Sequence, residues 1–252
     1  MTVYFIGAGP GHPDLLTLRA KHLIETCPVI LYAGSLVPEA VLTFAGKDTK
    51  KINTAALNLE EIVREFEKAA TEGHDVARLH SGDPSLYSAI TEQMAHLKEL
   101  NIAYEIVPGV PAFAAAAALM GQELTVPEIN QTLIITRTAK RATAVPEAQK
   151  LAQLAKSGAT LALHLSAKNT ADIEEELIPH YGADCPVIVA ANVSWPEQKC
   201  VRTTLSALQE VIEAHKIERT AIIFVGQALG QTPKTTSALY SKTHHRHLKP
   251  AP

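Results

Sequence analysis

Residues 3–11 read Val-Tyr-Phe-Ile-Gly-Ala-Gly-Pro-Gly, and this stretch decides the fold. Its first four residues predict a β-strand, and its glycines predict a tight turn where that strand ends. The residues that follow predict a helix, because Leu15, Leu18, Leu23 and Ile24 fall on one side of it. A strand, a glycine turn and a helix in this order indicate the first unit of an α/β protein.

The same alternation continues along most of the chain. Asn58 and Glu61 have the spacing of a helix capping box, and Gly73 predicts the end of that helix. Little periodicity is present between residues 121 and 131, which indicates a domain junction. We expect an α/β fold of two open α/β domains, 1–121 and 122–252, the second with a short polar tail. Strands are expected at 3–6, 29–32, 76–79, 103–107, 132–136, 160–165, 187–191 and 220–225, and helices at 15–27, 59–72, 86–100, 112–120, 171–178 and 205–215.

Charge and hydropathy limit the classes of partner. The 252 residues include 23 basic and 26 acidic side chains, which give a formal net charge of −3. No global positive field is available to hold nucleic acid or an anionic membrane, so recognition of anions must be local. The longest apolar run, Ala112–Met120, is too short to span a bilayer. The first residues lack the pattern of a signal peptide, and we therefore expect a cytoplasmic protein with no nucleic-acid or membrane partner.

No metal site and no catalytic base are predicted. The cysteines lack the spacing of a zinc site or redox motif, and the histidine cluster near the end of the chain is interpreted as a solvated tail. These residues are Cys27, Cys185, Cys200, His244, His245 and His247.

The glycine loop after the first strand has two alternative interpretations. A dinucleotide fingerprint requires a third glycine at position 12, where this chain has His12, and Pro10 has no N–H to offer a pyrophosphate. This disfavours a nicotinamide-dependent oxidoreductase. A plain strand-to-helix turn, with glycine at positive φ, is the other alternative.

Two further loops also follow strands. Residues 81–87 read Ser-Gly-Asp-Pro-Ser-Leu-Tyr, and residues 108–112 read Pro-Gly-Val-Pro-Ala. In open parallel sheets, ligands bind outside the carboxyl ends of the strands. Asp83 alone is equally typical of a helix cap, but three such loops in one half of the chain favour a binding site.

These three loops carry a resemblance to a known family. Residues 6–20, 81–87 and 108–110 resemble the S-adenosylmethionine-dependent tetrapyrrole methyltransferases of cobalamin and sirohaem synthesis. Residues 32–37, Tyr-Ala-Gly-Ser-Leu-Val, resemble the branch that methylates C11 of precorrin-4. Residues 136–141, 145–147 and 194–197 are similar to the same branch, and the similarity extends to about Leu229.

The resemblance implies a methyltransferase with S-adenosylmethionine in the cleft between two α/β domains, and a homodimer. It also implies a set of cofactor contacts. The residues in these positions are Pro10, Ser81, Gly82, Asp83, Leu86, Tyr87, Pro111, Ala112, Leu165, Val193, Thr220 and Ala221.

A tetrapyrrole substrate carries several carboxylates, which forked arginines bind well. Arg137 and Arg141, after a predicted strand of the second domain, are the first candidates for these contacts. Arg78 and Lys168 are weaker candidates. We expect Ser35 to help select the ring carbon, and Trp195 to act as a packing residue.

Methylation of C11 of precorrin-4, or of its cobalt complex, is therefore the predicted activity. Methylation of another ring position is the nearest alternative. A nicotinamide-dependent oxidoreductase and a non-catalytic metabolite-binding module are the alternatives from other classes.

Overall fold

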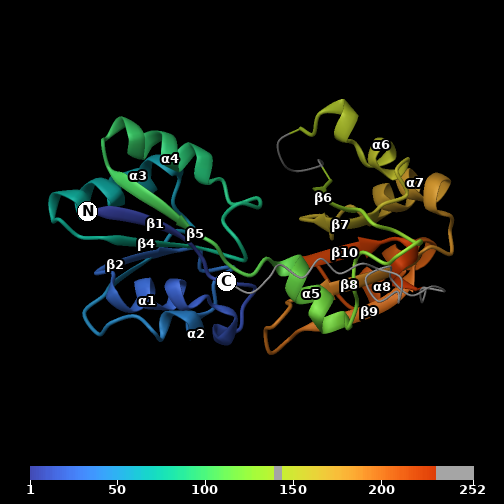
Figure 1. The fold of residues 1–252 in the computed structure, drawn as a ribbon, viewed down its shortest axis with the longest axis horizontal. Coiled ribbons are helices and arrows are strands. Elements are labelled where there is room, and N and C mark those ends of the chain that lie inside the picture. Colours follow the sequence, from blue (N-terminus) through green and yellow to red (C-terminus); the bar gives the residue numbers. More distant parts are fainter. Residues whose placement is uncertain (139–143, 231–252) are drawn as a thin grey trace, which may run out of the picture. The chain divides into compact units, whose positions relative to one another are not determined.

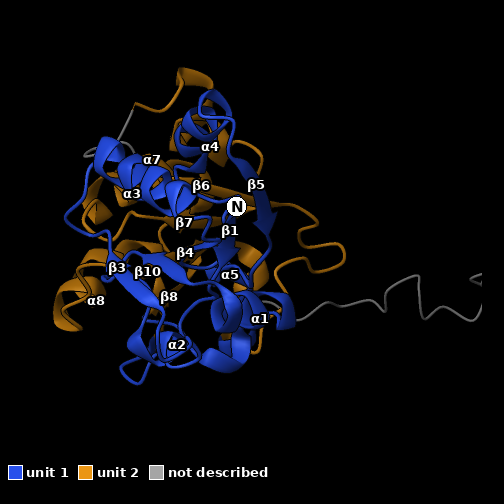
Figure 2. Ribbon diagram, turned by 90° about the vertical axis from the view of Figure 1, so that its left-hand side faces the viewer, with its two compact units in different colours: residues 1–119, 192–199 blue, residues 120–191, 200–252 orange. Residues whose placement is uncertain are grey.

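The computed structural model describes residues 1–138 and 144–230. The chain divides into two compact units, which Figure 2 shows in different colours. The first contains Met1–Leu119 and Asn192–Lys199, and the second contains Met120–Ala191 and the residues from Cys200 onward. Sequence patterns had grouped residues 192–199 with the second domain. Within the described residues, no helix is long and apolar enough to cross a membrane.

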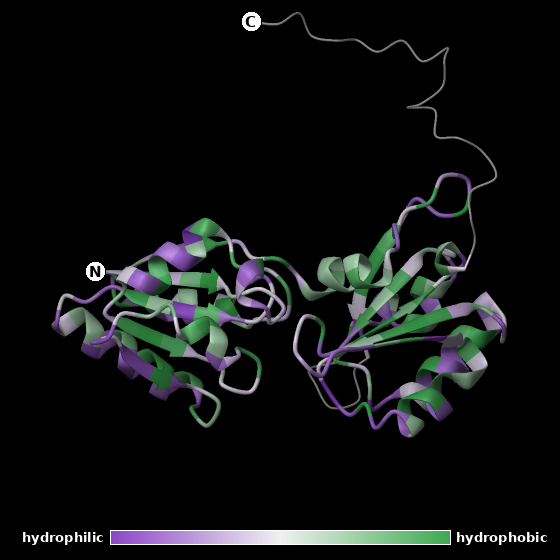
Figure 3. Ribbon diagram, turned by 90° about the horizontal axis from the view of Figure 1, so that it is seen from below, coloured by the Kyte–Doolittle hydropathy of each residue, from purple (hydrophilic) through white to green (hydrophobic). Residues whose placement is uncertain are grey.

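A parallel five-stranded sheet, in the order β3-β2-β4-β1-β5, forms the centre of the first unit (Figure 1). Its inner strands are largely buried and mostly apolar, with Arg78 and His80 of β4 as buried charged and polar exceptions. Figure 3 colours the chain by hydropathy. Parallel strands covered by helices on both faces require such continuous apolar runs. The strands are β1 (Thr2–Gly7), β2 (Val29–Tyr32), β3 (Lys50–Asn53), β4 (Val76–His80) and β5 (Ala103–Val107).

Helices cover both faces of this sheet. Ile6 and Leu79 pack with α1 and α2 on one face, whereas Val3 and Phe5 pack with α3 and α4 on the other. Figure 1 shows these two pairs on opposite sides of the sheet. The helical segments are η1 (Pro13–Leu15), α1 (Leu18–Thr26), α2 (Glu39–Leu42), α3 (Leu59–Thr71), α4 (Ile90–Glu99) and α5 (Ala112–Met120).

The first residues of α3 and α4 can be compared with the helix starts predicted from the sequence. The predicted capping box is confirmed, because the Asn58 side chain accepts from the Glu61 N–H and the Glu61 side chain accepts from the Asn58 N–H. The helix predicted from residue 86 is wrong at its beginning, since α4 starts at Ile90. Tyr87 and Ala89 have left-handed φ values of 54° and 48°, which no α-helix accommodates.

The strand order creates a switch point in the first unit. The chain leaves β1 through α1 on one face of the sheet, and leaves the neighbouring β4 through α4 on the other face. The carboxyl ends of β1 and β4 are therefore where the connections diverge. Open α/β sheets bind ligands at such a point.

The second unit has a mixed five-stranded sheet in the order β6-β7-β10-β8-β9. β6 and β7 are parallel, whereas β10 is antiparallel to both β7 and β8. The strands are β6 (Leu133–Arg137), β7 (Thr160–His164), β8 (Pro186–Ala191), β9 (Lys199–Thr204) and β10 (Ala221–Val225). The helical segments are η2 (Glu147–Gln149), α6 (Leu151–Ala155), α7 (Thr170–Tyr181), η3 (Leu205–Ala207), α8 (Leu208–Ala214) and η4 (Gln227–Leu229).

One continuous core joins the helices of the second unit to its sheet. Leu163 and Ile223, from β7 and β10, pack with Ile173 of α7 and Leu208 of α8. The strands β3 and β9 and the short helices α2 and α6 were not predicted from the sequence. Arg141 and the tail histidines lie outside the described residues.

Candidate functional site

Three loops of the first unit meet at the carboxyl edge of its sheet. They follow β1, β4 and β5, which are neighbours in the sheet. Gly9 and Gly82 form a two-way bridge between the first two loops, with N···O distances of 3.2 Å from Gly9 to Gly82 and 2.7 Å in the reverse direction. Main-chain atoms alone therefore join the loops that follow β1 and β4 at the switch point.

Close backbone packing explains the glycine that follows β5. A Cβ atom on Gly109 would collide with the carbonyl oxygen of Gly82 and with the backbone of Gly7. Gly82 in turn lies near Pro111 and Ala112, at which α5 begins. The structure therefore brings together the glycines and the predicted contact residues of the second and third loops.

Asp83 connects the second loop to the third. Its Oδ2 accepts a 2.8 Å hydrogen bond from the Gly109 N–H, and its Oδ1 accepts hydrogen bonds from the N–H and hydroxyl of Ser85. Burial acts to raise the pKa of the carboxyl group, but the hydrogen bonds from Ser85 and Gly109 outweigh it and lower the pKa below its ordinary value. The ionised Asp83 carboxylate thus links the second loop to the third by hydrogen bonds, and the sequence did not predict this link.

The remaining predicted residues of the second loop surround Asp83. Ser81 and Leu86 are half-buried, and Tyr87 is exposed in its left-handed conformation. A left-handed tyrosine is uncommon, and backbone strain of this kind concentrates at functional sites.

The segment Asn192–Lys199 holds the first loop. Trp195 Nε1 donates a 2.8 Å hydrogen bond to the Pro10 carbonyl, and the His12 N–H donates a 2.9 Å hydrogen bond to Ser194 Oγ. The indole also packs against Gly11, where a Cβ atom would collide with it. Trp195 is therefore a packing residue, as predicted, and its hydrogen bond fixes a residue of the predicted cofactor site.

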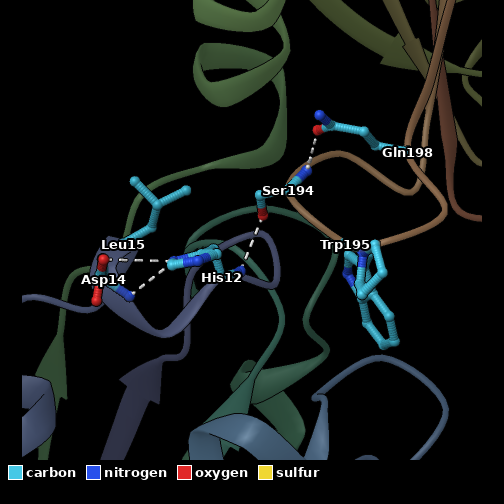
Figure 4. A pocket seen from close by; sticks show the side chains of 7 residues that line it. His12, Asp14, Leu15, Ser194, Trp195 and Gln198 are labelled. Carbon is cyan, nitrogen blue, oxygen red and sulfur yellow. Dashed lines mark hydrogen bonds and ion pairs between the residues drawn. The ribbon is translucent and has the colours of Figure 1, made fainter.

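A hollow of about 450 Å³ lies beside these contacts (Figure 4). His12 Nδ1 accepts a hydrogen bond from the Asp14 N–H, and Ser194 lies between His12 and Gln198 in the view. The hollow is lined by His12, Asp14, Leu15, Ser194, Trp195, Pro196 and Gln198. The predicted contact Val193 is buried next to this lining.

Ser35 lies in the loop that follows β2, at the same edge of the sheet as Pro10 and Ser81. Its side chain is exposed. The loop turns at Ala33, whose carbonyl accepts from the Leu36 and Val37 N–H groups. Ser35 therefore faces solvent at the ligand edge of the sheet.

Four predicted residues of the second unit gather at one edge of its sheet. β6 and β7 end there at Arg137 and just before Leu165. Because β10 is antiparallel, it begins at this same edge with Ala221, preceded by Thr220. The mixed strand directions thus bring together residues that lie far apart in the sequence.

The backbone at this second edge is strained. Leu165 has a φ of 55° and is 68% exposed, and Thr220 has a φ of 53°. Ser166 fixes the turn, since its Oγ accepts from the Thr138 N–H at 2.9 Å and donates to the His164 carbonyl at 2.6 Å. Leu165 therefore presents an exposed apolar side chain at this edge of the sheet.

The basic candidates have different surroundings. Arg137 is half-buried, and its guanidinium donates to the Thr138 carbonyl at 3.3 Å. Lys168 is exposed. The suggestion that Arg78 meets substrate is wrong, because its side chain is buried against α4 and its donors bond Thr54 and Gln93. A buried arginine of this kind has no sequence signal that separates it from a surface arginine.

The chain is similar in sequence and structure to proteins of a known family. Residues 2–209 match the family model for tetrapyrrole (corrin/porphyrin) methylases. A precorrin-4 C(11)-methyltransferase of Pseudomonas aeruginosa is 56% identical over 98% of each chain. A crystal structure of a cobalt-precorrin-4 methyltransferase is 42% identical, with a TM-score of 0.89 over 91% of this chain and 96% of the other.

A more distant relative has a bound ligand. The uroporphyrin-III C-methyltransferase of Thermus thermophilus, in complex with S-adenosylhomocysteine, is 26% identical, with a TM-score of 0.74 over 91% of this chain and 94% of the other. The chain therefore belongs to the tetrapyrrole (corrin/porphyrin) methylase family.

Proposed function

We propose that this methyltransferase transfers a methyl group from S-adenosylmethionine to C11 of precorrin-4 or of its cobalt complex, in cobalamin biosynthesis. The observation that carries the proposal is the closed switch point, where the Gly9–Gly82 bridge and the Asp83–Gly109 hydrogen bond hold three loops at one sheet edge. Full-length identity of 56% to a precorrin-4 C(11)-methyltransferase supports this substrate.

The residues at the two sheet edges suit this cofactor. The glycine backbone leaves space that a Cβ atom would fill, and Leu86 and Leu165 offer apolar contacts. S-adenosylmethionine supplies an electrophilic methyl group on a sulfonium. The residues that would hold it are Pro10, Ser81, Gly82, Asp83, Leu86, Tyr87, Pro111, Ala112, Leu165, Val193, Thr220 and Ala221.

The chain's contribution to such a transfer is to position the two reactants. Attack of a carbon nucleophile on a sulfonium methyl is an in-line displacement in which charge is lost, so alignment accounts for much of the rate enhancement. Arg137 and Arg141 are proposed to bind substrate carboxylates, and Ser35 is proposed to orient the ring. No general base is assigned.

The alternatives are less well supported. The uroporphyrin-III relative, whose substrate differs, is 26% identical, against 42% for the cobalt-precorrin-4 structure. For a nicotinamide-dependent oxidoreductase, the residues at positions 10 and 12 are unsuitable.

The decisive experiment is methyl transfer with a ¹³C-methyl-labelled cofactor. Precorrin-4 and cobalt-precorrin-4 serve as separate substrates, with uroporphyrinogen III as the matched control. Mass spectrometry and NMR of the product should show one added methyl, at C11, on at least one of the first two. Methylation at another ring carbon, or on uroporphyrinogen alone, would overturn the proposal. A thermal shift with S-adenosylhomocysteine but none with NADH is expected, since a ligand at 100 times its Kd stabilises by about 2.7 kcal/mol.

We also propose a homodimer. The resemblance supports it, and so do the exposed apolar side chains of Tyr104 and Ile106 along the edge strand β5. Light scattering should give twice the mass of the chain, and a monomer at micromolar concentration would contradict the proposal.

A further inference from the structure

Arg78 lies in β4 and is only 5% exposed to solvent. Within the described residues it has no ion pair with a carboxylate, unlike solvent-accessible basic side chains such as Lys21, which pairs with Glu25. Burial lowers the pKa of its guanidinium to about 10, which leaves it charged at neutral pH. Burying a charge without a counter-ion costs free energy of folding, so stability does not explain why an arginine occupies this position.

The two donors of Arg78 contact two different segments of the first unit. Nε donates to Gln93 Oε1 of α4 at 3.1 Å, and a terminal nitrogen donates to Thr54 Oγ1, just after β3, at 2.9 Å. Gln93 is 4% exposed and Thr54 is 6% exposed, so both bonds are shielded from water. Loss of either partner would leave a buried donor unsatisfied.

Each partner side chain donates a further hydrogen bond to a main-chain carbonyl. Gln93 Nε2 donates to the Ala89 carbonyl at 3.1 Å, and Thr54 Oγ1 donates to the Tyr32 carbonyl at 3.1 Å. Ala89 is the left-handed residue at which the 81–89 loop ends. Tyr32 is the last residue of β2, directly before the loop that contains Ser35.

We propose that Arg78 is a positioning residue that fixes the 33–37 and 81–89 loops with respect to each other at the ligand edge. This inference rests on the proposed function, in which the first loop orients the tetrapyrrole and the second contacts the cofactor. The rigid guanidinium presents Nε to one arm and a terminal nitrogen to the other, whereas the three N–H donors of a lysine share one nitrogen on a flexible stem. The buried charge is thus retained for loop geometry.

The two arms make separable predictions. Gln93→Glu keeps an acceptor for Arg78 and supplies a counter-charge, but it loses the donor to the Ala89 carbonyl. We expect its thermal midpoint to be unchanged or higher while the Kd for S-adenosylhomocysteine rises about fivefold. Thr54→Val has nearly the same volume and breaks the other arm. It should raise the KM for the tetrapyrrole about fivefold with little change in the Kd for S-adenosylhomocysteine, and Thr54→Ser should restore the KM.

Arg78→Met breaks both arms and should affect both constants, whereas Arg64→Met, at an exposed arginine of α3, is the matched control. Isothermal titration and steady-state kinetics give the two constants, and melting curves show that each variant is folded. If Gln93→Glu binds S-adenosylhomocysteine as tightly as the wild type, or if Thr54→Val has the same KM as the wild type, the inference is wrong. A wild-type protein that binds no S-adenosylhomocysteine would instead contradict the proposed function.

Discussion

Trp195 Nε1 donates a 2.8 Å hydrogen bond to the main-chain carbonyl of Pro10, across 185 positions of sequence. Together with the hydrogen bond from the His12 N–H to Ser194, it fixes the glycine loop that follows β1. Trp195 is the single tryptophan of the chain. A natural fluorophore therefore lies against the loop proposed to bind the cofactor.

Binding of S-adenosylhomocysteine should change the emission of Trp195 in a saturable manner. Trp195→Phe keeps an aromatic ring on Gly11 but removes the hydrogen bond to Pro10. Because a hydrogen bond contributes about 0.5–1.5 kcal/mol, the Kd measured by calorimetry should rise about threefold to tenfold. An emission spectrum that does not respond to saturating ligand, with an unchanged Kd in the variant, would show that this loop does not contact the cofactor.

Asp83→Ala should weaken S-adenosylhomocysteine binding about tenfold or more, because hydrogen bonds to a charged group contribute about 1.5–3 kcal/mol. The variant leaves the N–H groups of Gly109 and Ser85 without their acceptor. Asp48→Ala, at an exposed aspartate of the same unit, is the control. The lowered pKa means that the carboxylate is lost only as pH falls through that value, so its contribution should be constant from pH 5 to 8. A Kd within twofold of the wild type would remove Asp83 from the site.

Gly109→Ala should lower both the thermal stability and the affinity for S-adenosylhomocysteine. The added Cβ collides with the Gly82 carbonyl, and forced overpacking costs about 1–3 kcal/mol. Gly73→Ala is the matched control, because its Cβ meets nothing within 4 Å and only its left-handed φ is penalised, by about 1 kcal/mol. Gly73→Ala should therefore bind the ligand normally. Equal affinities for the two variants would contradict the close packing of the loops.

His80 should make the protein sensitive to acid. It is 6% exposed, and within the described residues its Nε2 has no hydrogen-bond partner. Burial, and then the charge of Arg78, lower its pKa from 6.5 to about 3. Between these values the unfolded chain binds the extra proton, so stability falls as pH decreases below 6.5.

His80→Leu should remove this dependence and lose about 2 kcal/mol less stability than the wild type between pH 7.5 and 5. Urea unfolding at both pH values measures the difference. His22→Gln changes an exposed histidine and leaves His80 in place, so it serves as the control. Parallel pH profiles for the wild type and His80→Leu would be inconsistent with a neutral buried imidazole.

Local patterns were sufficient where one segment satisfies its own requirements. The strand 29–32, the strand 103–107 and the capping box at Asn58 agree with the structure, because apolar runs and cap geometry are local. The edge strands β3 and β9 were missed, since Lys-Lys-Ile-Asn and Lys-Cys-Val-Arg-Thr-Thr are polar and acquire their strand structure from a neighbour. The late start of α4 was missed because left-handed residues before it have no composition signal.

The sequence by itself determined the α/β class, the three strand-end loops and the family, because glycine, proline and apolar runs restrict the backbone residue by residue. Only the tertiary structure decided that Asp83 joins two loops, that Arg78 is buried with its donors on Thr54 and Gln93, and that an antiparallel β10 brings Thr220 to the same edge as Leu165. The physical reason is that burial, hydrogen-bond partners and strand direction depend on residues distant in the chain, and no local pattern encodes them.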